Sequence, residues 1–304
     1  MLAVTGSTGK SGSIFLQELV EHASEVTQMF TGGVRLLVRS KQKLQTMNPK
    51  AVEVLHPDLA QGELTDEAYL SKALEGVDTL VHIAGIHWSR EVVRAAVKNH
   101  VRRLVFVHTT GIYSKYKAAG EEYRQIDAYV KEKCKQNQIK LTILRPTMIY
   151  GRTDDHNVCV FITMVDKLPI MPVVNGAHYK LQPVSYIDLG RAYWDVLTNE
   201  KVTTGKEYNL SGGNEIELRD MLTEIGKQLG KQVSFVSCPY TIAYAGAWML
   251  YIISIGNIDF RERVQRLCEP RVYSHKAATV DFGYHPCDFA EGVTAEIKTY
   301  KDGQ

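Results

Sequence analysis

A glycine-rich turn follows the first apolar run of the chain, Leu2–Thr5, and precedes a stretch with helical periodicity, Ser11–His22. In a strand–turn–helix of this kind, Gly6 allows the tight turn, Gly9 lets a pyrophosphate approach the backbone, and Gly12 lets the helix pack on the strand. The free N–H groups at the start of the helix then face the phosphates. The pattern predicts a dinucleotide site formed by consecutive residues: Gly6, Ser7, Thr8, Gly9, Lys10, Ser11 and Gly12.

The same turn contains Gly9-Lys10-Ser11, which is also found in the phosphate loops of nucleoside triphosphatases. Such a loop needs a further glycine upstream, at the position where this chain has Val4. The phosphate-loop alternative is therefore rejected.

The next predicted strand, Val34–Val38, ends in residues that bear on the choice of dinucleotide. Proteins that bind NAD usually place an acidic residue here, on the ribose 2′-hydroxyl. This chain has Arg39 instead, and a guanidinium can pair with a 2′-phosphate and stack on adenine. Lys41 and Lys43 add positive charge nearby. The sequence therefore predicts NADP(H) as the cofactor, with NAD as the second choice.

Two acidic–leucine pairs compete for the adenine end of the cofactor. Asp58-Leu59 follows a third predicted strand over Val52–Leu55, and Glu63-Leu64 lies further along the chain. Either pair offers one carboxylate and one apolar contact. We predict Asp58 and Leu59 as cofactor-binding residues, and the sequence leaves the choice between the two pairs open.

Several ordered motifs resemble the short-chain dehydrogenase/reductase superfamily, in its extended and atypical branches, which include the NAD-dependent epimerase/dehydratases and the NmrA-like proteins. The motifs are Thr5-Gly6-x-x-Gly9-x-x-Gly12, Gly76-Val77-Asp78-x-Leu80-Val81-His82-x-Ala84-Gly85 and Leu144-Arg145-Pro146-x-x-Ile149-Tyr150-Gly151. Further similarities lie in Gln182–Ala192, Tyr208–Gly212 and Phe282–Val293, so the resemblance covers nearly the whole chain.

The resemblance implies further contacts with the cofactor after the fourth, fifth and sixth strands of the fold. The residues that it assigns to this role are Ile83, Ala84, Gly85, Thr109, Pro146, Thr147 and Ile149. It also implies that Thr110 stands where the family often has a catalytic serine or threonine.

Dehydrogenases of this superfamily use a Tyr-x-x-x-Lys pair, in which the lysine lowers the tyrosine pKa and the tyrosine transfers a proton as hydride moves. The chain has one literal match, Tyr129 and Lys133, close before the sixth predicted strand. If Asp127 instead takes the family's acidic position on this helix, Ala119 and Tyr123 occupy the positions of the pair. Both registers stay open. The other hydroxyl candidates for catalysis are Thr110, Tyr113 and Tyr123.

Short β-rich runs alternate with amphipathic stretches through the first half of the chain, which is typical of a parallel sheet covered on both faces. The predicted strands are Leu2–Thr5, Val34–Val38, Val52–Leu55, Thr79–Ile83, Arg103–His108 and Leu141–Leu144. Right-handed crossovers then lead to a doubly wound arrangement. The predicted fold class is α/β, a Rossmann doubly wound parallel sheet with a smaller, mostly helical lobe. We assign residues 1–151 and 177–211 to the Rossmann domain, and residues 152–176 and 212–304 to an interleaved substrate-binding lobe.

The predicted lobe contains an unusually apolar stretch. No charged residue lies between Lys231 and Asp259, and Tyr240–Ile255 is nearly all apolar. A membrane span needs about 20 such residues, so the stretch favours a buried or pocket-lining helix. An interfacial patch and an oligomer contact are the alternatives, and an apolar helix would also suit a lipid-linked substrate. The arginines that follow predict either a solvated face or a contact with an anionic nucleotide moiety: Arg261, Arg263, Arg266 and Arg271.

Composition limits the classes of function. The 304 residues carry 36 Lys and Arg against 34 Asp and Glu, and a net charge of +2 gives no global field for nucleic acid. The five cysteines are far apart and form no C-x-x-C pair, so no zinc site or disulfide framework is indicated. We predict no metal site. The first residues show no cleavable signal, which together with the cysteines predicts a cytoplasmic protein.

We therefore expect an NADP(H)-dependent oxidoreductase or epimerase acting on a small carbonyl, hydroxyl or nucleotide-sugar substrate. The alternative is a non-catalytic NADP(H) sensor or scaffold of the NmrA-like type, favoured by the doubtful Tyr/Lys pair. The expected partner is a small-molecule substrate, with no nucleic acid and no transmembrane span. A weak peripheral membrane contact and a homodimer stay open.

Overall fold

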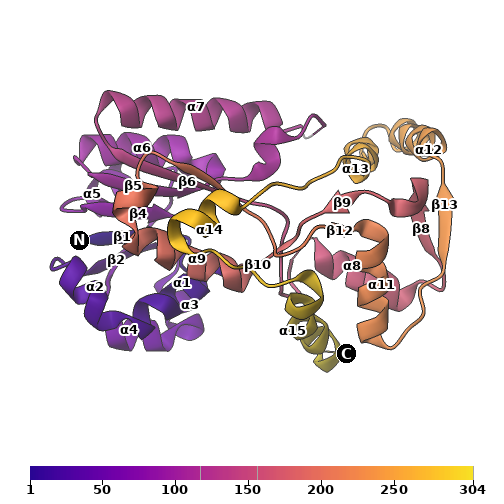
Figure 1. The fold of residues 1–304 in the computed structure, drawn as a ribbon. Coiled ribbons are helices and arrows are strands. Elements are labelled where there is room, and N and C mark those ends of the chain that lie inside the picture. The colour runs from indigo at the N-terminus through magenta and orange to yellow at the C-terminus, as the bar shows by residue number, and fades with distance from the viewer. Residues whose placement is uncertain (117, 156, 304) are drawn as a thin grey trace.

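The computed structural model describes residues 1–116, 118–155 and 157–303. Its centre is a seven-stranded sheet in which every neighbouring pair is parallel, in the order β11-β6-β5-β4-β1-β2-β3 (Figure 1). The strands are β1 (Leu2–Thr5), β2 (Val34–Val38), β3 (Asp58–Gln61), β4 (Thr79–His82), β5 (Arg103–Val107), β6 (Lys140–Pro146) and β11 (Glu207–Leu210). The strand order reverses between β1 and β4, and ligands of such sheets bind at the carboxyl ends there. The predicted doubly wound α/β fold is confirmed.

Helices cover both faces of this sheet because successive side chains of a strand point to opposite faces. Leu2 and Val4 of β1 join a core with α1 (Lys10–Glu21) and α9 (Tyr186–Thr198), whereas Ala3 joins the opposite core. That second core contains α5 (Glu67–Ala73), α6 (Ser89–Lys98) and α7 (Gly120–Gln136). The other helical segments around the sheet are α2 (Ala23–Met29), α3 (Lys41–Met47), α4 (Pro49–Leu55), α10 (Glu200–Thr203), α14 (Lys276–Phe282), η1 (Ile86–Trp88) and η2 (Thr110–Tyr113).

The prediction of a strand over Val52–Leu55 is wrong, because these residues belong to the helix α4. Pro49 occupies the first turn of α4, where its fixed φ suits a helix and its missing N–H costs nothing. Val52 and Leu55, three residues apart, both pack against the core around α1. The third strand is β3, so Asp58 begins this strand instead of following it.

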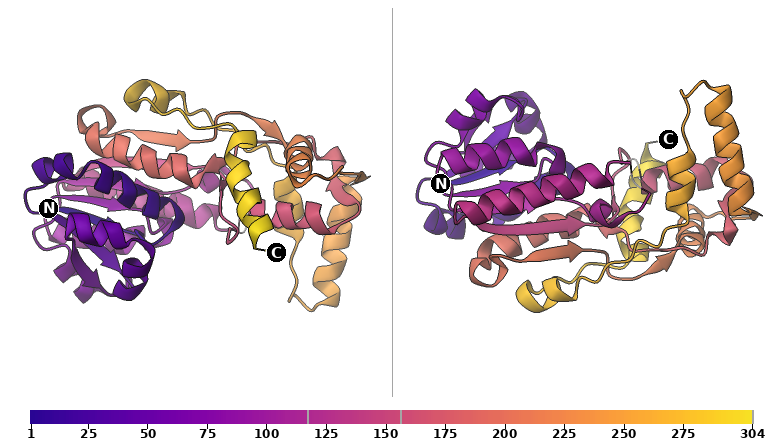
Figure 2. Two further views of the ribbon diagram at one scale, coloured as in Figure 1. Left: turned by 90° about the horizontal axis from the view of Figure 1, so that it is seen from below. Right: turned by 90° about the horizontal axis from the view of Figure 1, so that it is seen from above.

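A lobe with its own core lies beyond the carboxyl ends of the strands (Figures 1 and 2). It is mostly helical, with three short strand pairs, β7 with β10, β9 with β12 and β8 with β13. Its elements are β7 (Ile149–Tyr150), α8 (Val158–Lys167), β8 (Met171–Val174), η3 (Asn175–Ala177), β9 (Lys180–Leu181), β10 (Val184–Ser185), β12 (Ile216–Glu217), α11 (Leu218–Leu229), β13 (Phe235–Cys238), α12 (Tyr240–Ile253), α13 (Arg261–Leu267) and α15 (Phe289–Asp302).

The chain crosses between the two parts more often than the sequence suggests. The sequence assigns residues 212–304 to the lobe as one block, yet α14 lies within them and packs on the Rossmann side. Ala278, Phe282 and Tyr284 are buried in the core that contains α1 and α9, and the Phe282 ring meets that of Tyr208 on β11. The chain then returns to the lobe in α15, whose Phe289 and Val293 are buried there.

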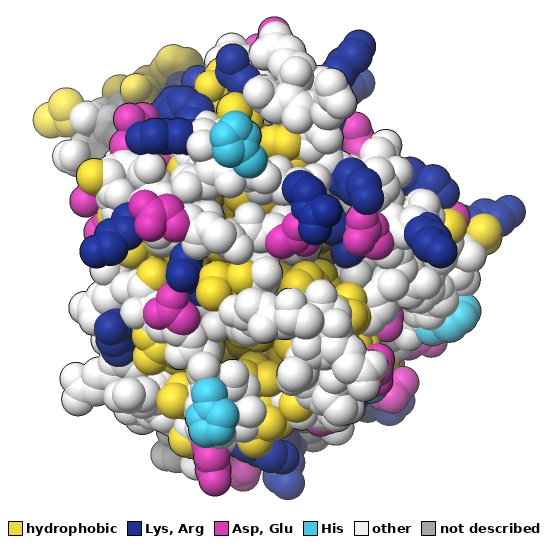
Figure 3. Space-filling view, turned by 90° about the vertical axis from the view of Figure 1, so that its left-hand side faces the viewer, with side chains coloured by type: hydrophobic (Ala, Val, Ile, Leu, Met, Phe, Trp, Pro, Cys, Tyr) yellow, Lys and Arg dark blue, Asp and Glu magenta, His cyan; other side chains and the backbone are white. Residues whose placement is uncertain are grey.

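The surface at the end of the molecule farthest from the lobe carries both signs of charge. Figure 3 shows Lys and Arg side chains interspersed with Asp and Glu around apolar side chains on this face. The mixture agrees with the net charge of +2, and no large single-sign field appears on this face.

Candidate functional site: a dinucleotide groove joined to a second cavity

A groove of about 610 Å³ opens at the carboxyl ends of β1, β2 and β4. Its walls come from the glycine-rich turn, the loops after β2, β3 and β4, and the first residues of the lobe. The lining residues are Gly6, Thr8, Gly9, Lys10, Ser11, Leu37, Val38, Arg39, Lys43, Gly62, Glu63, Leu64, Thr65, Ile83, Ala84, Trp88, Ile149, Asp155 and Asn157. The turn, Arg39, and the residues after β4 and β6 thus meet in one cavity, as expected of a dinucleotide site.

The glycines of the turn are required by space. Gly6 has a φ of +75°, and a Cβ there would lie 2.6 Å from the backbone nitrogen of Ala84. A Cβ on Gly12 would lie 2.2 Å from the carbonyl oxygen of Gly6. Helix α1 begins directly after this turn, and its N-cap residue Gly9 offers no side chain to the first N–H groups. The turn therefore has the close-packed, donor-rich form that fits a pyrophosphate.

His82 holds the turn against the loop that follows β4. Its Nδ1 lies 2.7 Å from the Thr5 hydroxyl and its Nε2 lies 3.1 Å from the Gly85 carbonyl oxygen. A carbonyl only accepts, so Nε2 carries the proton and Nδ1 accepts from Thr5. Burial, assisted by nearby His108, lowers the pKa of His82 to about 3, so the ring stays neutral. His82 positions the floor of the groove and is no proton donor at neutral pH.

Of the two acidic–leucine pairs considered for the adenine end of the cofactor, only Glu63-Leu64 lines the groove. Asp58, at the start of β3, accepts a hydrogen bond of 2.6 Å from Arg35 Nε on β2. Neither Asp58 nor Leu59 lines the groove, whereas Glu63 and Leu64 do. The reason is the position of β3, whose carboxyl end is Gln61, so that the residues after it reach the site.

A second cavity of about 260 Å³ adjoins the groove, since Ile149 and Asn157 line both. The loops after β5 and β6 form one wall, and lobe residues form the other. Its lining residues are Thr109, Thr110, Gly111, Ser114, Thr147, Met148, Ile149, Asn157, Leu181, Gln182, Arg266, Arg271 and Tyr273. Thr110 donates to the Pro146 carbonyl oxygen at 3.1 Å, which ties the ends of β5 and β6 together.

Two arginines of the lobe face this second cavity. Arg271 is partly buried, and desolvation together with the charge of Arg266 lowers its pKa to about 10. Arg266 lies 3.8 Å from the Glu262 carboxylate, one helical turn away. The nearby Glu269 is held by the Ser114 hydroxyl at 2.6 Å and the Lys115 N–H at 2.8 Å. The cavity therefore presents positive charge to whatever enters it.

The sequence named these arginines without deciding their role. It missed the contributions of Asn157, Gln182 and Tyr273 altogether. All of them come from the lobe or its connections, and no local motif brings them together. The sequence shows Arg266 and Arg271 five positions apart, but only the fold shows that both residues line the same cavity.

The literal Tyr129–Lys133 match lies elsewhere. Both residues are on α7, where Lys133 Nζ lies 5.6 Å from the centre of the Tyr129 ring and the Arg90 guanidinium of α6 lies 5.7 Å from it. Tyr129 packs with the core between α6 and α7, and neither residue lines the groove or the second cavity. At 1.5 Å per residue, Tyr129 stands about 13 Å along α7 from its first residue.

The other predicted hydroxyls stand nearer to the strand ends. The Tyr123 hydroxyl, in the first turn of α7, lies 3.2 Å from His87 Nε2. The Tyr113 hydroxyl donates to Asn209 Oδ1 at 3.3 Å, and its ring packs on that of Tyr273 with 5.2 Å between centres. Of the predicted catalytic residues, Thr110 alone is among those that line the second cavity in the described part of the chain.

The buried Asp127 carboxylate is paired with three side chains of the protein. It lies 2.8 Å from His108 Nδ1, 2.7 Å from Arg145 Nη2 and 2.7 Å from Lys131 Nζ. Burial opposes its ionisation, but these partners hold its pKa well below the usual range. Asp127 therefore joins α7 to β5 and β6 as a structural anion.

Comparisons with known proteins agree with this geometry. Residues 6–168 match the NAD(P)H-binding family, which is more than half of the chain, so the protein belongs to that family. The predicted resemblance is thus confirmed at the level of this NAD(P)H-binding family, and an epimerase is among the similar proteins.

One curated relative is N-acetyl-alpha-D-glucosaminyl-diphospho-ditrans,octacis-undecaprenol 4-epimerase of Escherichia coli O157:H7. It is 25% identical over 257 residues, which cover 73% of this chain and 76% of the relative. Among solved structures, dTDP-glucose 4,6-dehydratase from Streptomyces venezuelae with NAD bound has a TM-score of 0.72 at 18% identity, covering 99% of this chain and 97% of the other.

A second solved structure is the NADPH-dependent quinone oxidoreductase of Escherichia coli in complex with NADPH. It has a TM-score of 0.69 at 19% identity, and covers 97% of this chain and 99% of the other. At these identities the two structures support the fold alone. The family match thus establishes an NAD(P)H-binding protein, and the solved structures establish its fold.

Proposed function

We propose that the protein is an NADP(H)-dependent oxidoreductase or epimerase whose substrate carries a diphosphate. The observation that carries the proposal is that the dinucleotide groove and the arginine-lined cavity meet at Ile149 and Asn157. A nicotinamide bound at the end of the groove would supply hydride exchange. The residues of the second cavity would bind and orient the molecule that exchanges the hydride.

The preference for NADP(H) follows from the end of β2. Arg39 and Lys43 both line the groove, and no carboxylate stands at the position that would contact a ribose 2′-hydroxyl. A guanidinium pairs with a phosphate through two parallel hydrogen bonds, so Arg39 would bind the 2′-phosphate of NADPH.

Calorimetric titration of the full chain with NADPH and with NADH tests the cofactor proposal. We expect NADPH to bind at least ten-fold more tightly, and the Arg39→Asp variant to lose or reverse that ratio. Lys41→Asp is the matched control, because Lys41 lies close by in sequence but does not line the groove. An unchanged ratio in Arg39→Asp would exclude Arg39 as the reader of the 2′-phosphate.

The diphosphate is proposed from the charge of the second cavity. Arg266 and Arg271 are suited to a doubly charged group, since guanidinium groups match the oxygen geometry of phosphates. Two of the similar proteins are named for diphosphate-linked sugars, the epimerase from Escherichia coli and the dehydratase from Streptomyces venezuelae. A sugar attached to a diphosphate is therefore the substrate class that we propose.

Proton transfer and hydrogen bonding to the sugar fall to the hydroxyls that reach this cavity. Thr110, which follows β5, and Tyr273, in the lobe, both line it. Burial, and then the charge of Glu269, raise the pKa of Tyr273, so its phenol stays protonated and can donate a hydrogen bond to the sugar. We expect Tyr273→Phe to lower kcat by ten-fold or more with little change in NADPH affinity. A kcat within two-fold of the wild type would remove Tyr273 from this role.

A further inference from the structure

Helix α12 is an apolar helix that the rest of the molecule leaves uncovered. It has 14 residues, none of them charged, and only Ala247 is buried. Figures 1 and 2 place it at the outer end of the lobe beside α13, away from the sheet. We define the apolar cap as its large exposed side chains together with the next one beyond its end: Ile242, Trp248, Met249, Leu250, Ile252, Ile253 and Ile255.

The apolar cap differs from scattered surface hydrophobes because its exposed side chains gather on one helix and the residue just beyond it. Ile252 and Ile253 are 61% and 71% exposed, and Ile255 is 90% exposed. Clustered apolar surface of this kind marks a site of interaction with a protein or a membrane. The sequence favoured a buried or pocket-lining helix, but α12 lines neither the groove nor the second cavity.

We propose that the apolar cap inserts into the surface of an anionic lipid bilayer. A second copy of the chain is the less suitable occupant. A helix of this length is about 21 Å long and 10–12 Å wide, so a contact made by it alone covers a few hundred Å² at most. Stable protein pairs bury about 800 Å² on each partner. A bilayer sets no such limit, because its apolar interior surrounds the helix on several sides.

The aromatic residues around α12 fit the same occupant. The rings of Tyr240 and Tyr244 are stacked with 5.6 Å between centres, and those of Trp248 and Tyr251 meet edge to face at 6.1 Å. Tyrosine and tryptophan are enriched where the hydrocarbon of a membrane meets its headgroups, because one end of each side chain is apolar and the other polar.

Basic residues follow directly after the apolar cap. The Arg261 guanidinium lies 3.8 Å from the centre of the Tyr251 ring and is paired with Asp259. Arg263 is exposed, and within the described residues it forms no ion pair. An unpaired arginine beside an apolar helix is attracted to anionic lipid headgroups. This charge distinguishes a bilayer from a neutral apolar partner.

The mode of contact is interfacial. No described helix is long and apolar enough to cross a membrane. Helix α12 packs on α13, and α13 carries Arg266, which lines the second cavity. Docking by the apolar cap would therefore bring that cavity close to the lipid surface. The docking itself requires no assumption about the reaction.

Flotation of the full chain with lipid vesicles tests the proposal. We expect the protein to float with vesicles of phosphatidylcholine and phosphatidylglycerol, and the Ile252→Asn/Ile253→Asn variant to bind at least ten-fold more weakly. Asparagine adds no charge, so repulsion cannot explain the loss. Val280→Asn is the matched control, since Val280 is 74% exposed on α14 and lies outside the apolar cap. This control should float like the wild type.

The lipid charge is tested separately. Arg263→Gln should weaken binding to the anionic vesicles about five-fold and leave weak binding to pure phosphatidylcholine unchanged. Melting temperature and NADPH affinity, measured on every variant, should match the wild type because all the changed side chains are exposed.

Three outcomes would overturn the proposal. The first is a wild type that stays unbound with anionic vesicles. The second is equal loss of flotation in the Val280→Asn control. The third is a dimer seen by sedimentation without lipid that the double variant abolishes, with no flotation of the wild type. That last result would assign the apolar cap to contact between copies of the chain.

Discussion

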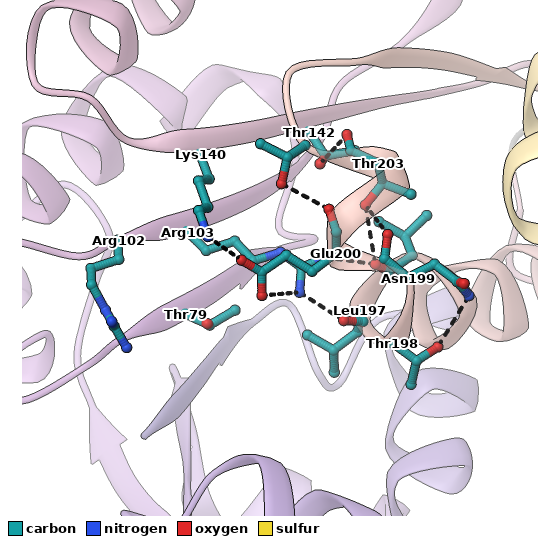
Figure 4. Close-up of polar contacts among 12 residues, drawn as sticks. Thr79, Arg102, Arg103, Lys140, Thr142, Leu197, Thr198, Asn199, Glu200 and Thr203 are labelled. Atoms are coloured by element: carbon teal, nitrogen blue, oxygen red, sulfur yellow. Dashed lines mark hydrogen bonds and ion pairs between the residues drawn. The ribbon is translucent and has the colours of Figure 1, made fainter.

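Arg103 is buried and Arg271 is partly buried with its Nε enclosed, but the chain around them neutralises only one of the two charges. Arg103, the first residue of β5, donates to the carbonyl oxygen of Leu197 at 2.7 Å (Figure 4). It also donates to the carbonyl oxygen of Val196 at 2.6 Å. Glu200 lies 3.6 Å away and also pairs with Lys140. The carbonyls belong to the last turn of α9, where a positive charge is favoured by the helix dipole.

Arg271 has no comparable partners. Among the residues described, its side chain forms no hydrogen bond or ion pair, and its nearest charged neighbours include another arginine, Arg266. Burial lowers the pKa of both arginines. Keeping a buried charge without a partner costs stability, so its retention points to a ligand that supplies the missing anion. The comparison separates an arginine that the protein itself satisfies from one that, under the proposed function, binds the substrate.

The largest expected effect is on the structural arginine. Arg103→Met should lower the free energy of unfolding by about 3 kcal/mol, because it leaves the last carbonyls of α9 and the Glu200 carboxylate without their buried partner. Urea denaturation measures this change. Arg102→Met is the control, since Arg102 is 79% exposed and its pair with Asp78 should contribute less than about 1 kcal/mol. Equal losses in the two variants would remove the structural role from Arg103.

The second prediction concerns Arg271, where we expect a loss of ligand binding and no loss of stability. Arg271→Met should leave the free energy of unfolding unchanged or slightly raised, because it removes a buried charge without orphaning a partner. It should weaken binding of UDP-N-acetylglucosamine to the NADPH-saturated protein by about 10- to 100-fold, which corresponds to one charged hydrogen bond. Calorimetry with NADPH present isolates the second cavity. Arg103→Met, where it remains folded, should bind the sugar nucleotide with wild-type affinity. Weaker binding in Arg103→Met together with unchanged binding in Arg271→Met would contradict the roles assigned to the two arginines.

A further buried ionisable group, the Glu296 carboxyl, avoids a buried charge by staying protonated. Glu296 on α15 is fully buried, and its Oε2 accepts from the Gly151 N–H at 2.9 Å. Burial, and then the charge of Asp155, raise its pKa to about 8. Between about pH 5 and pH 8 the folded protein therefore binds more protons than the unfolded chain. Stability should fall as pH rises through this window, by up to about 1.4 kcal/mol per pH unit.

Glu296→Gln should flatten this pH dependence, because the amide keeps an oxygen for the Gly151 N–H and has no proton to lose. Thermal unfolding measured from pH 5 to pH 8 gives the slope. Glu291→Gln, on an exposed position of the same helix, is the control and should keep the wild-type slope. An identical slope in Glu296→Gln would mean that this carboxyl does not titrate in that range.

The sequence predicts best those parts of the fold and the site that depend on residues close together along the chain. The turn from Gly6 to Gly12 is set by steric needs within a few residues, so its pattern predicts where the groove lies, and the alternation of strands and helices predicts the fold class. The strand at Val52–Leu55 was misplaced because a short apolar run suits a helix as well as a strand, and Pro49 was the overlooked signal.

The second cavity depends on contacts between distant segments. Arg271 meets Thr110 there only because the chain enters and leaves the lobe several times, and no spacing in the sequence encodes that meeting. The uncovered state of α12 is likewise a property of the fold, since an apolar run in the sequence looks the same whether it is buried or exposed.

The smallest expected effect concerns the tyrosine that best matches the family's motif in letters alone. Tyr129→Phe keeps the ring that packs between Arg90 and Lys133 and removes only the hydroxyl. We expect the free energy of unfolding to change by less than about 1 kcal/mol. NADPH affinity and turnover should stay within two-fold of the wild type, because Tyr129 lines neither cavity. Steady-state kinetics beside Tyr273→Phe provides the contrast. A hundred-fold loss of kcat in Tyr129→Phe with unchanged stability would place the reaction at α7 instead of in the arginine-lined cavity. The binding role proposed for Arg271, and its contrast with the structural Arg103, would then be wrong.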